Sequence, residues 1–153
     1  MADSSGEVWF YHLERSSLTQ VLSDLLEKTL NRGWRAMVRV RDPQLMSALD
    51  EQLWTGRPDS FLPHGRADAD NAERQPVLLT TQAGNQNGAQ ALFIVDGADM
   101  GDLTGLDRCL VVFDGRDEAA LERAREQWKQ VKAAGQDASY WRQNEEGAWT
   151  RAA

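Results

Sequence analysis

The stretches 91-ALFIVDG-97 and 108-RCLVVFDG-115 carry the clearest structural signal in this sequence. Each is an apolar run without the polar alternation of a half-exposed strand, which is typical of a β-strand buried on both faces. Strands of this kind belong to largely parallel sheets that helices cover on both sides. Both runs end in Asp-Gly, at residues 96–97 and 114–115, and we expect a turn at each pair.

Strand-like and helix-like segments alternate around these two runs. The other expected strands are residues 7–13, 35–40 and 76–81. The expected helices run from Leu18 to a stop at Gly33, from Pro43 to a stop at Gly56, and from Asp117 to Ala134. This alternation predicts an α/β fold with a mostly parallel central sheet. Because no repeat or boundary divides the chain, residues 1–153 are expected to form a single domain.

Two segments lack the period of a helix or strand. Residues 55–75 form a polar loop that is interrupted by the aromatic stretch 53-LWTGRPDSFLPHG-65. The aromatic residues of this stretch either fold back onto the core or meet another molecule. Residues 136–153 are aromatic but polar, and we interpret them as a C-terminal tail with no assigned element.

The sequence shows no recognisable catalytic or cofactor site. A dinucleotide site needs a glycine-rich turn after the first strand, where this chain has LERSSL, and a phosphate-binding loop is also absent. A single cysteine, Cys109, excludes a disulfide framework and a cysteine-rich zinc site. His12 is expected to be structural or exposed. We therefore expect no cofactor, no metal and no catalysis, with an unrecognised enzyme site around His64 and Asp96 as the alternative.

Charge and hydropathy limit the partners of this protein. The chain has 24 acidic and 17 basic residues and a net charge of −7. Because DNA binding depends on cations that neutralise phosphates, direct binding to DNA is not expected. The first residues, MADSSGEVWFYHL, lack the regions of a signal peptide, and no apolar run is long enough to span a membrane. We expect a cytoplasmic protein without membrane contact.

The last predicted helix gathers positive charge around a tryptophan. Arg125, Lys129 and Lys132 lie on adjacent turns, and Trp128 lies one turn after Arg125. One explanation is that the cations complement the helix macrodipole while Trp128 packs inward. The other is a binding surface for a peptide that is both acidic and aromatic, in which the cations hold carboxylates and Trp128 supplies apolar contact.

Three features together resemble the chi subunit of bacterial DNA polymerase III holoenzyme: the order of elements, the segment LWTGRPDSFLPHG and the helix REQWKQVKAAG. In this family an aromatic residue at the end of the second helix precedes a Ser-Phe-Xaa-Pro-His stretch. The matching residues here are Trp54, Ser60, Phe61, Pro63 and His64. The resemblance extends from the FYHL strand to about Gly135 and does not include the C-terminal tail.

The resemblance implies a Rossmann-like, three-layer α/β/α domain without a nucleotide site. It also implies a non-catalytic accessory subunit, associated with the clamp loader, that binds the acidic, Phe-ended C-terminal tail of single-stranded DNA-binding protein. The better-known members of the family also pair with the psi subunit, which connects them to the clamp loader, so psi is an expected partner where the host has one. A protein-interaction module with an unrelated partner is the alternative.

The resemblance further implies which residues meet each partner. Those expected to bind the tail of single-stranded DNA-binding protein are Arg125, Trp128, Lys129, Lys132 and Trp54. Those expected to face the psi subunit are Phe61, Pro63 and His64, although Phe61 could equally fold back on the core with Pro63. Leu121 stands where some members have a lysine, so the tail site is expected to be less charged than theirs.

Overall fold

The computed structural model describes residues 7–14, 18–55, 65–66, 76–81, 87–95, 97–99, 106–143 and 149–152, with the backbone alone at 53–55 and 65–66. The strands are β1 (Glu7–Leu13), β2 (Ala36–Arg39), β3 (Gly65–Arg66), β4 (Val77–Thr80), β5 (Ala91–Ile94), β6 (Arg108–Asp114), β7 (Ala138–Gln143) and β8 (Trp149–Arg151). The helices are α1 (Leu18–Asn31), α2 (Pro43–Thr55) and α3 (Glu118–Ala133).

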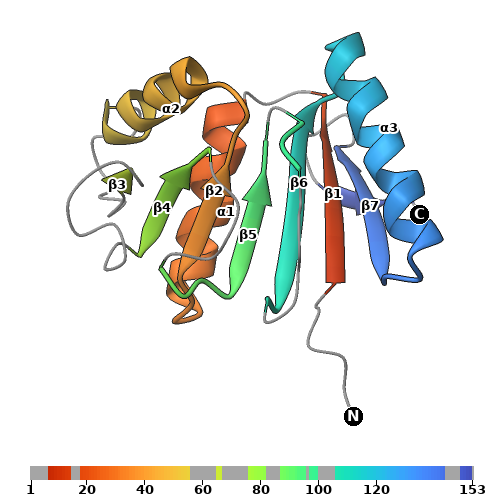
Figure 1. The fold of residues 1–153 in the computed structure, drawn as a ribbon, viewed down its shortest axis with the longest axis horizontal. Coiled ribbons are helices and arrows are strands. Elements are labelled where there is room, and N and C mark those ends of the chain that lie inside the picture. Colours follow the sequence, from red (N-terminus) through yellow and green to blue (C-terminus); the bar gives the residue numbers. More distant parts are fainter. Residues whose placement is uncertain are drawn as a thin grey trace.

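Within these residues the strands form one eight-stranded sheet in the order β3-β4-β2-β5-β6-β1-β7-β8 (Figure 1). Every neighbouring pair is parallel except β7 and β8, which run antiparallel. The first strand, β1, lies inside the sheet between β6 and β7. The expected α/β fold with a mostly parallel sheet is therefore confirmed.

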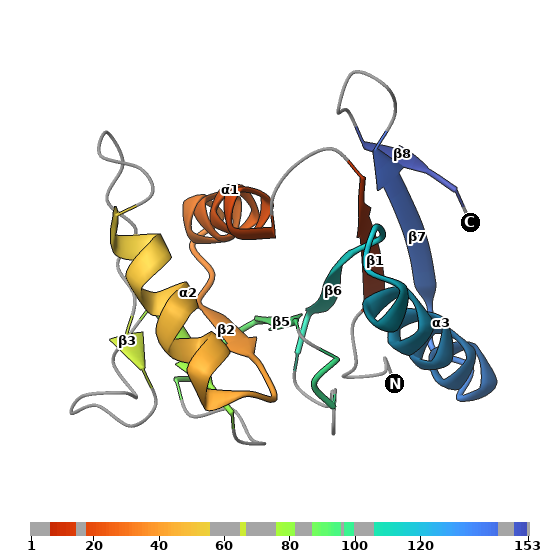
Figure 2. The same cartoon turned by 90° about the horizontal axis from the view of Figure 1, so that it is seen from above.

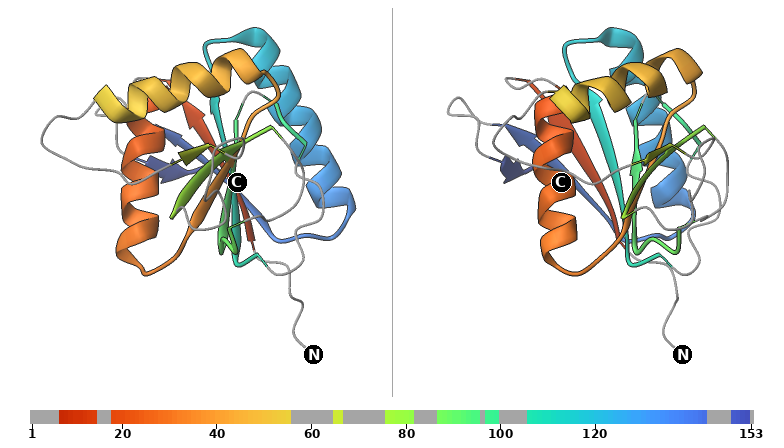
Figure 3. Two further views of the ribbon diagram at one scale, coloured as in Figure 1. Left: turned by 60° about the vertical axis from the view of Figure 1, so that its left-hand side comes forward. Right: turned by 90° about the vertical axis from the view of Figure 1, so that its left-hand side faces the viewer.

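The helices cover the sheet unevenly. α1 lies on one face and α3 on the opposite face, which gives the expected three layers (Figures 2 and 3). α2 crosses above β2 and β4 and adds Met46 and Leu49 to the core on the α1 side (Figure 1). Since α1 contacts β2 and β6 whereas α3 contacts β6, β1 and β7, the two layers are displaced along the sheet.

The core consists of one apolar cluster on each face of the sheet. In β1, Tyr11 and Leu13 belong to the cluster on the α1 side, whereas Val8 and Phe10 belong to the cluster on the α3 side. This alternation follows from the two-residue period of a strand. It explains why the central strands are apolar at almost every position, because both faces of the sheet are buried.

Local sequence signals mark the start of α3, the stop after α1 and the turn after β6. The carboxylate of Asp117 caps α3 by accepting the backbone N–H of Ala119 at 3.0 Å. Gly33 follows α1 with φ of +83°, a left-handed conformation that glycine adopts without strain. The turn expected at Asp114 is present, since this carboxylate accepts the N–H of Arg116 at 3.0 Å. Asp96 lies outside the described residues.

The structure adds three strands that the sequence did not predict. β3 lies within the expected loop, and β7 and β8 lie within the expected C-terminal tail. In β7 the burial pattern opposes residue polarity: Ser139 and Gln143 are buried, whereas Tyr140 and Trp141 are partly exposed. The indole N–H of Trp141 donates to Ser139 Oγ at 2.9 Å, and the backbone N–H of Glu14 donates to Gln143 Oε1 at 3.0 Å. The described part of the tail therefore forms an edge of the sheet.

Candidate functional site

An aromatic cluster joins α3 to two strands of the sheet. The indole of Trp128 packs edge-on against Phe10 of β1 and Tyr140 of β7, with ring centroids 5.3 and 5.7 Å away. Phe10 and Tyr140 are themselves stacked at 6.3 Å. Trp128 is only partly buried, so packing holds one side of its ring while another side stays accessible. The inward packing expected of Trp128 is therefore present, and its part in a peptide-binding surface stays a prediction.

Cations lie around the accessible part of this indole. Lys132 Nζ is 5.4 Å from the centroid of the Trp128 ring, which is within cation–π range. Arg125 and Lys129 are exposed on neighbouring turns of α3. Burial raises the pKa of Tyr140, and the positive charges of Arg142 and Arg125 oppose that rise.

We call Arg125, Trp128, Lys129, Lys132 and Tyr140 the α3 surface. Its chemistry is that of a binding site for an anionic group next to an apolar one. An aromatic ring held in place by packing offers contact at low entropic cost, and neighbouring cations attract carboxylates.

His12 supports this surface from within the sheet. Its side chain is largely buried, and Nδ1 lies 2.7 Å from the hydroxyl oxygen of Tyr140. Burial lowers the pKa of His12, and the charge of Arg142 lowers it further. The imidazole is therefore neutral at pH 7 and acts as a hydrogen-bonding partner of Tyr140, which confirms the expected structural role. Gly115 packs so closely on the ring that a Cβ there would overlap it.

Residues 6–139 match the protein family described as DNA polymerase III chi subunit, HolC. The chain belongs to the DNA polymerase III chi subunit family. This family is an accessory component of DNA polymerase III. The matched range contains α3 and ends one residue before Tyr140.

Two further proteins are similar to this chi-family chain, one in sequence and one in fold. A protein of Rickettsia prowazekii (strain Madrid E), described as a probable DNA polymerase III subunit chi, is 24% identical over 103 residues. That match covers 67% of this chain and 62% of the relative, so the chain spans less than two thirds of the relative's length. The solved C-terminal domain of the DEAD-box protein Dbp5 has a TM-score of 0.50 at 15% identity, covering 90% of this chain and 91% of that one. The second likeness shows the fold alone.

Of the chi-family residues expected from the loop motif, only the backbone of Trp54 is described. Trp54 belongs to the C-terminal end of α2, which lies on the side of the molecule away from α3 (Figures 1 and 2). α2 contacts α1 and β4, whereas α3 contacts β6, β1 and β7. The expected part of Trp54 in the tail site stays a prediction, because only the backbone of this residue is described. Phe61, Pro63 and His64 lie outside the described residues.

Sequence reasoning did not assign Phe10 or Tyr140 to the site of this chi-family protein. The available signal was the aromatic density of two segments, VWFYHL and SYWRQ, which become the adjacent strands β1 and β7. Without strand pairing, nothing in the sequence placed them under Trp128.

The described residues contain neither a candidate metal cluster nor a candidate membrane span. Among the described residues of this chi-family chain, no group of three or more His, Cys, Asp or Glu side chains could hold a metal ion. In the same part of the chain, no helix has the length and apolarity that a bilayer crossing requires.

Proposed function

We propose that this chi-family protein is a non-catalytic accessory subunit of the DNA polymerase III holoenzyme, associated with the clamp loader, whose α3 surface binds the acidic C-terminal tail of single-stranded DNA-binding protein. The observation that supports this most is the partly exposed indole of Trp128, held by Phe10 and Tyr140 and next to Lys132, on a protein with a net charge of −7. A local cationic and aromatic patch on an acidic protein favours an acidic, aromatic-ended peptide.

The terminal Phe of the tail would contact Trp128, and its carboxylate would pair with Arg125. Lys129 and Lys132 would attract the acidic residues that precede the Phe. Each exposed ion pair contributes only about 0–1 kcal/mol, so the aromatic contact has to supply much of the affinity. A micromolar dissociation constant, about −8 kcal/mol, suits a patch of this size.

Weak individual contacts are compatible with tight association on a coated DNA strand. Many tails close together raise the effective concentration of the ligand, so that avidity exceeds the affinity of one tail. The same weakness lets each tail dissociate rapidly as a polymerase moves. The proposed subunit would therefore link the replication machinery to the coated strand without fixing it there.

The link to the clamp loader would pass through the psi subunit, and Phe61, Pro63 and His64 are the residues that the family motif assigns to it. Co-elution of this protein with the psi subunit of its host on size exclusion would support this link. Phe61→Ala should abolish co-elution while leaving tail binding intact. An unchanged complex would remove Phe61 from the contact.

The deciding experiment is fluorescence anisotropy of a labelled tail peptide titrated with the protein. A second peptide lacks the terminal Phe. Arg125→Ala should weaken binding by about three- to tenfold, as loss of one charge-assisted contact predicts. Arg41→Ala removes another exposed cation, outside the α3 surface, and serves as the matched control. Equal effects of the two substitutions, or equal binding of the two peptides, would exclude the α3 surface as the site.

A further inference from the structure

The described helices cover the two faces of the sheet over different strands. α3 contacts β1 and β7 on one side, whereas α1 on the other side contacts β2 and β6. In the described part of the chain, no helix lies over β1 and β7 on the α1 side (Figure 2). Strands of a parallel sheet are normally covered on both faces, so this uncovered area is unusual for the fold.

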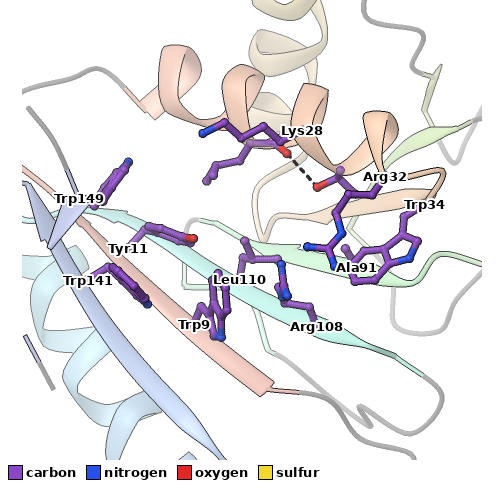
Figure 4. Close-up of a pocket in the computed structure, with 12 residues that line it drawn as sticks. Trp9, Tyr11, Lys28, Arg32, Trp34, Ala91, Arg108, Leu110, Trp141 and Trp149 are labelled. Atoms are coloured by element: carbon purple, nitrogen blue, oxygen red, sulfur yellow. Dashed lines mark hydrogen bonds between the residues drawn. The ribbon is translucent and has the colours of Figure 1, made fainter. Parts of the chain in front are cut away.

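The uncovered area forms a groove with aromatic walls. Its cavity of about 250 Å³ is lined by Trp9, Tyr11, Trp34, Trp141 and Trp149, and therefore by four of the six tryptophans in the chain (Figure 4). We call it the indole groove. Tyr11 is buried at its base, whereas the four tryptophans stay partly exposed together, which marks a binding surface rather than ordinary packing.

The rings of the indole groove are held in place by one another and by hydrogen bonds. Trp149 lies edge-on to Tyr11 at 4.9 Å, and Trp9 and Trp141 lie 5.8 Å apart. The indole N–H groups of Trp9 and Trp141 already donate to Glu7 and Ser139. These two rings therefore offer a ligand apolar surface, without unsatisfied donors.

Three cations line the same groove. Arg108 Cζ lies 4.0 Å from the centroid of the Trp9 ring and 5.5 Å from that of Trp34, and Arg32 Cζ lies 4.3 Å from the Trp34 centroid. Lys28 of α1 completes the set. Among the described residues, no ion pair within 4.0 Å joins any of the three to a carboxylate.

The two guanidinium groups beside Trp34 repel each other. Burial lowers the pKa of Arg108, and the charge of Arg32 lowers it further, while Glu7 and Asp107 oppose this only in part. An anion placed between Arg32 and Arg108 would relieve the repulsion. A ligand for the groove thus needs negative charge and an apolar or aromatic side chain.

We propose that the indole groove binds an acidic, aromatic-containing segment of a partner protein, on the face of the sheet opposite the α3 surface. Charge favours a short peptide over nucleic acid, because three cations on a chain of net charge −7 attract a few carboxylates but not a long run of phosphates. The position of the groove at the edge of the sheet also favours a peptide. β8 ends the strand order beside the groove, and its outer backbone groups suit an added peptide strand.

The inference does not depend on tail binding at α3, since the two sites use different residues on opposite faces. The six tryptophans separate them in one experiment, because each indole N–H gives its own signal in a heteronuclear NMR spectrum of the nitrogen-15-labelled protein. Single Trp→Phe variants assign the signals. The probe is a short synthetic peptide rich in Asp and Glu, with one internal Phe and an amidated C-terminus.

We expect this peptide to shift the signals of Trp9, Trp34, Trp141 and Trp149. Arg32→Gln with Arg108→Gln should weaken that response about tenfold or more, since both charge-assisted contacts are lost. Lys28→Gln, which removes an exposed cation of the groove, should weaken it less and tests the site independently of any effect on folding. The matched control, Arg125→Gln with Lys132→Gln, removes the same charge from the α3 surface and should leave the response unchanged.

Three results would overturn the proposal. Shifts confined to Trp128 would place the acidic peptide at α3 alone. No shift at millimolar peptide would mean that the groove does not recognise this chemistry. A thymidine oligonucleotide that shifts the four groove signals where the peptide does not would assign the groove to single-stranded nucleic acid instead.

Discussion

The hydroxyl oxygen of Tyr140 lies 2.7 Å from Nδ1 of His12, although 128 residues separate the two in the sequence. His12 belongs to β1 and Tyr140 to β7, which are adjacent parallel strands. The contact sets the orientation of the Tyr140 ring, and this ring in turn packs against Trp128. A hydrogen bond between β1 and β7, on either side of α3 in the sequence, therefore lies next to the α3 surface and adds to the stability of the fold there.

Acid should destabilise the protein through His12. Burial lowers the pKa of His12 in the folded state, so the unfolded chain, with a histidine pKa of about 6.5, binds this proton more readily. The stabilising contribution is complete above about pH 6.5 and decreases as the pH falls towards the folded-state pKa. Urea midpoints at pH 7 and pH 5 should differ more for the wild type than for His12→Asn. An equal loss in both proteins would assign the acid sensitivity to other groups.

Gly115→Ala should destabilise the fold because of the closeness of His12. The added methyl would overlap the imidazole, force the ring to move and break its contact with Tyr140. Overpacking of this kind costs about 1–3 kcal/mol in the free energy of unfolding. Gly33→Ala is the control: its φ of +83° carries the left-handed backbone cost, but nothing lies within 4 Å of the new methyl. If Gly33→Ala lowered the urea midpoint more than Gly115→Ala did, overlap with His12 would not be the main cost of a side chain at position 115.

Trp128→Ala should separate ligand contact from stability. Loss of the indole removes the apolar wall of the α3 surface, so affinity for the tail peptide should fall about tenfold or more in the anisotropy titration. Tyr140→Phe keeps an aromatic wall but removes the hydrogen bond to His12. This variant should bind the peptide normally while losing about 1 kcal/mol of stability. The reverse pattern would mean that the hydroxyl of Tyr140, rather than the indole, contacts the ligand.

Cys109 should be inert in the folded protein and report on unfolding. Its side chain is 2% exposed, and burial raises its pKa to about 12. A thiol reagent at about pH 8 should therefore label one thiol per chain in urea and almost none in native buffer. Rapid labelling of the native protein would show that β6 opens locally, well below the free energy of global unfolding.

The central strands and the helices were predictable because their apolar residues follow a clear period. The runs around Phe93 and Val112 are apolar throughout, as burial on both faces requires, and both are central strands. β7 was not predictable for the opposite reason. Its buried positions hold Ser139 and Gln143, which hydrogen bonds satisfy, and its aromatic residues face the two surfaces.

The candidate site, too, was predictable from the sequence only in part. Arg125, Trp128 and Lys132 share one side of a helix, so the helical spacing alone brought them together. The approach of Trp54 depended on how α2 packs against the sheet, which a sequence pattern does not encode. The indole groove was hidden for a further reason: its tryptophans come from β1, β7, β8 and the segment after α1, and only the strand order makes them neighbours.

The position of β1 between β6 and β7 has a consequence for synthesis on the ribosome. β1 is translated before both of its neighbours, and it cannot pair with β6 until residues 108–114 have been translated, or with β7 until residues 138–143 have been. Until then its apolar side chains, including Val8 and Phe10, have no sheet to join. The nascent chain must therefore keep an aggregation-prone segment in solution until β6 and β7 have been translated, and only then can the native sheet close around β1.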